Sequence, residues 1–66
     1  MVRVNEREIE YKKGMTVADA IREAGQSIDK MTIVIVDGIV LTLDEIKYVI
    51  VEDGAFIKLL PLISGG

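Results

Sequence analysis

Only one segment of this 66-residue chain has helical periodicity over two turns, and that segment strongly limits the possible folds. Four apolar residues at i, i+3, i+4 and i+7 form one stripe: Val17, Ala20, Ile21 and Ala24. Thr16 can cap the first turn, Asp19 completes a capping box, and Gly25 can end the helix in a left-handed conformation. We therefore predict one main helix over residues 17–24.

The other apolar segments have the period of β-strands. Residues 1–12 alternate apolar and polar side chains around a short polar break, which predicts a β-hairpin. Further strands are expected at residues 32–37, 39–41, 49–51 and 56–62. Thr42 is placed to cap a single helical turn. The chain is thus an α+β domain with a sheet and one helix.

The strand at residues 32–37 is apolar on both faces. Ile33 and Ile35 point one way, and Val34 and Val36 point the other. Such a strand usually lies in the interior of a sheet. One helix can cover only one face of that sheet, so the other face is expected to be partly exposed and apolar. An exposed apolar face suggests a docking surface.

The side chains offer little for catalysis. The chain has neither cysteine nor histidine, which excludes thiolate nucleophiles, disulfides, Cys/His metal sites and imidazole bases. Two adjacent acid pairs, Asp44 with Glu45 and Glu52 with Asp53, point in different directions and are expected to be solvated. A domain of this size hardly encloses an active site. We expect no enzyme activity and no bound metal.

Charge and hydropathy narrow the surroundings of the protein. The formal net charge is −3 and no contiguous basic patch suggests nucleic-acid binding. The longest apolar run, Ile33 to Val36, is too short to span a bilayer, and no secretory signal is visible. We expect a cytoplasmic protein without nucleic-acid or membrane partners.

The C-terminal Gly65-Gly66 pair follows directly on an apolar strand and is the strongest functional signal. A terminal carboxylate reacts with a nucleophile only after activation, for example as an acyl-adenylate, and another protein must bring ATP to it. Glycine has no Cβ to obstruct a narrow site and adopts extended or left-handed angles freely. The sequence therefore suggests a C-terminus that is activated by a partner.

Five motifs together resemble the ThiS-type sulfur carriers, with the MoaD type as a longer cousin. They are Val2-Arg3-Val4-Asn5, Gly14-Met15-Thr16-Val17, Val34-Ile35-Val36-Asp37-Gly38, Val51-Glu52-Asp53-Gly54 and Ile63-Ser64-Gly65-Gly66. The resemblance covers essentially the whole chain. It implies a ubiquitin-like β-grasp fold, with a mixed sheet packed on one main helix and parallel first and last strands. It divides the chain into a domain at residues 1–63 and a flexible tail at residues 64–66.

The resemblance also implies a reaction route in which this chain is a co-substrate. A ThiF-like, ubiquitin-activating-like adenylyltransferase would use ATP and magnesium to adenylate Gly66. A sulfur donor, ultimately a cysteine persulfide made by a cysteine desulfurase, would convert the adenylate to a thiocarboxylate. A thiazole synthase of thiamine biosynthesis would take the sulfur. Ile63, Ser64 and Gly65 would thread into the partner, and the chain itself would bind no cofactor.

Parity along the last strand suggests where the partner docks. Leu60 and Leu62 share one side and are the candidates for the exposed docking face, whereas Ile57 and Leu59 are expected in the core. Pro61 between them indicates a bulge or an edge.

Three alternatives remain open at the level of sequence. A MoaD-like carrier would supply sulfur for molybdenum or tungsten cofactor. A carrier for tRNA thiolation, or a ubiquitin-like modifier of lysines, would use the same adenylate. A non-covalent TGS-like binding module would share the Gly14-Met15-Thr16-Val17 pattern without needing the Gly-Gly end. The short length favours the thiamine type over the MoaD type.

Overall fold

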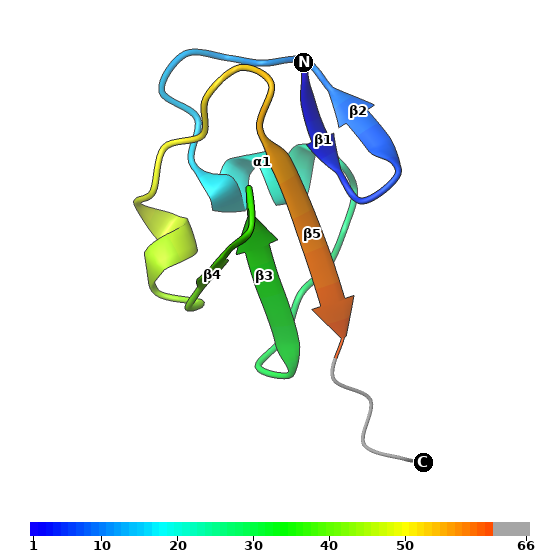
Figure 1. Cartoon of the computed structure of the whole chain (residues 1–66), viewed down its shortest axis with the longest axis vertical. Helices are drawn as coiled ribbons and strands as arrows, with labels where there is room; N and C mark the ends of the chain where they lie inside the picture. The colour runs from blue at the N-terminus through cyan, green and yellow to red at the C-terminus, as the bar shows by residue number, and fades with distance from the viewer. Residues whose placement is uncertain (62–66) are drawn as a thin grey trace.

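The computed structural model describes residues 1–61, which form one mixed sheet and one helix (Figure 1). The elements are β1 (Val2–Val4), β2 (Arg7–Ile9), α1 (Val17–Glu23), β3 (Thr32–Val36), β4 (Ile39–Leu41), the 3₁₀ turn η1 (Glu45–Lys47) and β5 (Phe56–Pro61). The predicted hairpin is present, although its second strand ends at Ile9.

The sheet has the strand order β2-β1-β5-β3-β4. Its two central strands, β1 and β5, run parallel and come from opposite ends of the chain, whereas every other pairing is antiparallel. The helix α1 lies behind the sheet, and the two hairpins flank the central pair (Figure 1). This arrangement is the β-grasp fold, so the predicted α+β class, the interior position of β3 and the central parallel pair are confirmed.

The helix packs its predicted stripe into the core. Val17, Ala20 and Ile21 are buried together with Ala24, which forms the C-cap. Both halves of the capping box are formed: the Thr16 hydroxyl accepts from the Asp19 N–H, and the Asp19 carboxylate accepts from the Thr16 N–H, each at 3.1 Å. The helix therefore begins and ends almost where its sequence predicts.

The prediction of a strand at residues 49–51 is wrong. The segment is extended, but it joins the chain before α1 through an isolated bridge between Thr16 and Ile50. Val49 accepts from the Val17 N–H at 2.9 Å, and Val51 donates to the Met15 carbonyl at 3.0 Å. The segment thus places Val51 in the core without forming a strand of the sheet.

The predicted boundary between the domain at residues 1–63 and the tail at residues 64–66 lies outside the described residues. The last described residue, Pro61, ends β5. Figure 1 shows β5 running from the end of the molecule that holds the N-terminus toward the opposite end. The segment that follows β5 therefore starts from a central strand at the far end of the sheet.

Candidate functional site

The last strand presents its residues alternately to the core and to the exposed side of the sheet. Ile57 is completely buried and Leu59 is 7 % exposed, whereas Phe56 is 44 % and Leu60 is 39 % exposed. The predicted parity of Ile57, Leu59 and Leu60 is thus correct. Leu62, the second residue predicted for the docking face, lies outside the described residues, as do Ile63, Ser64, Gly65 and Gly66.

The C-terminal half of β5 has a strand on one side only. The parallel pairing with β1 covers Phe56 and Ile57, whereas the antiparallel pairing with β3 runs on without a bulge to Thr32 opposite Pro61. Proline lacks the N–H that a ladder requires, and here it is the last described residue of its strand. No bulge interrupts the pairing of β5 with β3 as far as Pro61.

Two hairpin turns supply side chains that bind the β5 backbone. Asn5 follows β1, and its Oδ1 accepts from the Leu59 N–H at 2.8 Å, beyond the last β1 pairing. Asp37 follows β3, and its Oδ1 accepts from the Phe56 N–H at 3.0 Å. The strand that leads to the C-terminus is thus fixed from both flanking hairpins. Sequence reasoning missed both contacts, although the turn signals at these two positions mark where to look.

The sheet face away from α1 carries apolar and cationic side chains. We call it the open face, and it consists of Arg3, Glu8, Ile33, Ile35, Val40, Phe56, Lys58 and Leu60. Cross-strand pairs bring Leu60 beside Ile33, and Lys58 beside Ile35. The guanidinium carbon of Arg3 lies 6.0 Å from the Phe56 ring centroid, within the range of a cation–π contact. The open face is therefore an apolar patch with two cations and, on the edge strand β2, one acid, on a chain whose net charge is −3.

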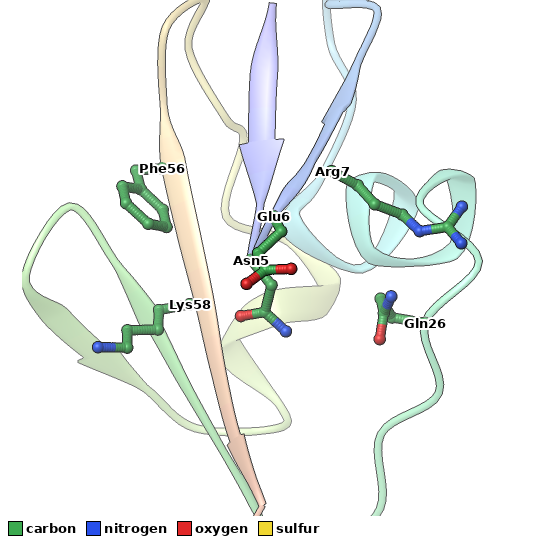
Figure 2. A pocket seen from close by; sticks show the side chains of 6 residues that line it. All are labelled: Asn5, Glu6, Arg7, Gln26, Phe56 and Lys58. Carbon is green, nitrogen blue, oxygen red and sulfur yellow. The ribbon is translucent and has the colours of Figure 1, made fainter.

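A hollow at one edge of this region does not assemble a catalytic site. Its lining residues are Asn5, Glu6, Arg7, Gln26, Phe56 and Lys58. Figure 2 shows Arg7 reaching toward α1 and Gln26, while Phe56 and Lys58 project from the other side of β5. The Oδ1 atom of Asn5 is already bonded to Leu59. The polar groups of the hollow thus do not converge on one point.

Several acidic residues of the described chain have structural partners. Glu45 accepts from the Thr42 N–H at 2.8 Å while the Thr42 hydroxyl accepts from the Glu45 N–H, so Thr42 caps the turn that leads into η1. Asp53 binds the N-terminal ammonium of Met1 at 2.6 Å. Within residues 1–61, no group of three acidic, histidine or cysteine residues is arranged to hold a metal ion. None of the helices among these residues has the length and apolarity that crossing a membrane requires.

The mixed sheet, the single crossing helix and the apolar open face define a ubiquitin-like β-grasp protein. The ThiS family model matches residues 2–66, and the chain belongs to the ThiS family. Members of this family are small sulfur carriers, so the resemblance seen in the sequence motifs is confirmed. No solved structure matches the chain. The family match extends through Gly65 and Gly66.

Proposed function

We propose that Gly66 is the residue that carries sulfur, as a C-terminal thiocarboxylate, and that the sulfur goes to thiazole formation in thiamine biosynthesis. The family match through the final Gly-Gly pair is the observation that carries this proposal. The chain acts as a protein co-substrate and not as an enzyme. It works in the cytoplasm and binds no cofactor itself.

The first step is activation by a ThiF-like adenylyltransferase. The Gly66 carboxylate attacks the α-phosphorus of ATP, pyrophosphate leaves, and an acyl-adenylate forms on the chain. Magnesium bound to the nucleotide in the partner balances the phosphate charge. Gly65 and Gly66 let the terminus enter a narrow site because neither has a Cβ. Ile63 and Ser64 of the carrier lie in the partner's channel behind them.

The second step exchanges AMP for sulfur. The terminal sulfur of a persulfide, supplied through a cysteine desulfurase, attacks the activated carbonyl carbon. The bond between that carbon and the phosphate oxygen breaks, and AMP leaves. The product is an acyl disulfide. A second thiol attacks the sulfur that belongs to the donor, forms a disulfide with it, and releases the thiocarboxylate. The two electrons that cleave the S–S bond come from that thiol.

The open face, together with Leu62, supplies the recognition. Phe56 at the start of β5 and Leu60 near its last described residue offer apolar area, and Arg3 and Lys58 add positive charge beside it. A partner with an apolar surface flanked by carboxylates fits this face. The hydrogen bonds that Asn5 and Asp37 accept from β5 hold the strand in place, so docking on the open face sets the direction in which the terminus leaves.

Intact-mass spectrometry tests the central claim. The chain is incubated with ATP, magnesium, its adenylyltransferase, a persulfide donor and a thiol. We expect the mass to rise by the difference between sulfur and oxygen, and fragmentation to place the change on Gly66. Deleting Gly66 should abolish loading, whereas the matched control Ser64→Ala should retain it. Equal loading of the deletion variant would refute the proposal.

A second assay separates the pathways. The loaded chain is presented in turn to a thiazole synthase, to the large subunit of a molybdopterin synthase and to a tRNA-thiolating enzyme. We expect the thiazole synthase alone to consume the thiocarboxylate. Transfer to either of the others would assign the carrier to that pathway instead and leave the chemistry at Gly66 unchanged. Attachment to partner lysines would identify a ubiquitin-like modifier.

A further inference from the structure

The two edges of the sheet differ sharply in composition. The edge strand β2 reads Arg7-Glu8-Ile9 and carries two charges. The opposite edge strand, β4, reads Ile39-Val40-Leu41 and has none, although Ile39 is 65 % and Val40 is 63 % exposed. Proteins commonly protect edge strands with charged residues because an unprotected edge pairs with other strands. The β4 edge lacks that protection.

The register shows which backbone groups of β3 point toward β4. Asp37 donates its N–H to the Phe56 carbonyl on β5, at 2.9 Å. Backbone groups alternate in direction along a strand, so Ile35 also points at β5. Val34 and Val36 point the other way, toward β4. The turn between β3 and β4 has two residues with positive φ, Asp37 at 50° and Gly38 at 85°, which is the usual two-residue hairpin.

The same alternation leaves one residue of β4 free to pair outward. Val34 is opposite Leu41 and Val36 is opposite Ile39, so those two residues of β4 use their backbone groups on β3. Val40 lies between them and directs its N–H and C=O away from the sheet. Within residues 1–61, the backbone hydrogen bonds of turns and loops do not involve Val40.

We propose that β4 pairs antiparallel with β4 of a second copy of this chain, with Val40 opposite Val40 on a two-fold axis. Each Val40 then donates to the carbonyl of the other, and Ile39 faces Leu41 of the second copy. This proposal does not depend on the sulfur-carrier function. The two five-stranded sheets join into one, and the two open faces become continuous through Val40.

The charge of β4 fits a second copy. The strand carries no charged residue, so no like charges meet when two β4 strands pair antiparallel around Val40. A pairing of two β2 strands would instead bring Arg7 and Glu8 of both copies into the contact. Two hydrogen bonds and a few apolar side chains form a small interface, so the dimer is weak and concentration-dependent.

Sedimentation equilibrium over micromolar to millimolar concentrations tests the dimer. We expect the mean mass to rise from the 7.3 kDa of the monomer toward twice that value. Val40→Pro removes the outward N–H without touching the β3 pairing and should keep the chain monomeric with an unchanged circular dichroism spectrum. The matched control is Glu8→Pro, which removes the corresponding outward N–H on β2 and should leave association intact. A wild-type chain that stays monomeric throughout overturns the proposal.

A charge exchange tests the two-fold register even if the proline variant unfolds. Val40→Lys and Val40→Glu each place like charges opposite one another and should each remain monomeric alone. An equimolar mixture should associate again, because lysine then faces glutamate. A mixture that stays monomeric refutes the register. Association that survives in both single variants but is lost in Leu60→Lys would show that the open face, and not β4, joins the copies.

Discussion

Asn5 and Asp37 are the non-glycine residues with positive φ in the described part of the chain, at 54° and 50°. Most L-residues lose about 1–2 kcal/mol in this conformation, whereas asparagine and aspartate adopt it more readily. Each of the two also accepts a hydrogen bond from β5. One side chain at each turn thus closes a hairpin and holds the strand that leads to the C-terminus.

Substitutions at Asn5 should separate these two roles. Asn5→Gly tolerates the positive φ but leaves the partly buried Leu59 N–H without its acceptor, so we expect a loss of about 1 kcal/mol in unfolding free energy. Asn5→Ala adds the backbone strain and should lose roughly 1 kcal/mol more. Urea denaturation measures both. Equal stability of the glycine variant and the wild type would show that the Asn5–Leu59 bond contributes nothing.

Among the elements, α1 is a short helix of only seven residues. Isolated helices of that length do not form in water, so packing and capping must both support it. The capping box meets two of the backbone N–H groups that a helix leaves unpaired at its start. Thr16→Ala should therefore destabilise the fold by about 1 kcal/mol.

The capping box makes the stability of the protein dependent on pH. The Thr16 N–H, which donates to the Asp19 carboxylate, and next the nearby Thr16 hydroxyl lower the pKa of that carboxyl, and Arg22 acts in the same direction. A lowered folded-state pKa stabilises the fold above the unfolded-state pKa, and that contribution disappears as the pH falls through the folded value. The stability advantage over Asp19→Asn should shrink accordingly in acid. Carboxyl titration by NMR should show a partial rise of the Asp19 pKa in Thr16→Ala, and an unchanged pKa would contradict the assignment.

The alternation along β5 can be tested with two truncations of similar size. Ile57 is fully buried, so Ile57→Ala should cost about 2–5 kcal/mol through the cavity it leaves. Leu60 lies on the open face, and Leu60→Ala should change stability by less than about 0.5 kcal/mol. Thermal unfolding of both variants gives the comparison. Similar losses would mean that β5 does not present its residues as described.

Local patterns predicted the helix, its capping box and the two sides of β5 because each of these depends on neighbours in sequence. The same reasoning failed where distant residues decide. Val49 and Val51 alternate with Ile50 as in a strand. Their backbone partners, Val17 and Met15, flank the start of the helix, so only a single β-bridge forms there. The contact between Asn5 and Leu59 joins residues 54 positions apart, and no short-range pattern contains it. The predicted threading residues after Pro61 lie outside the described chain.

At the scale of the whole molecule, charge is distributed unevenly. The chain carries 11 acidic and 8 basic residues, yet the open face holds two cations, Arg3 and Lys58, and one acid, Glu8, which lies opposite Arg3 on the edge strand β2. A carrier recognised by apolar contact needs charge to select its partner, because apolar area alone discriminates poorly. The open face combines both properties beside the strand that leads to Gly66.

This arrangement predicts how a charge on the open face affects activation. Leu60→Asp replaces apolar area with an acid beside Ile33 and should leave the fold intact, because Leu60 is outside the core. We expect the KM of the adenylyltransferase for the carrier to rise at least tenfold, corresponding to about 1.4 kcal/mol of lost binding, with kcat little changed because Gly66 is untouched. Pyrophosphate release at varied carrier concentration measures both constants.

Glu10→Gln, on an exposed residue outside the open face, is the matched control and should behave as wild type. If Leu60→Asp lowered kcat at an unchanged KM, the residue would act on the chemical step and the open face would not be the surface that the activating partner binds.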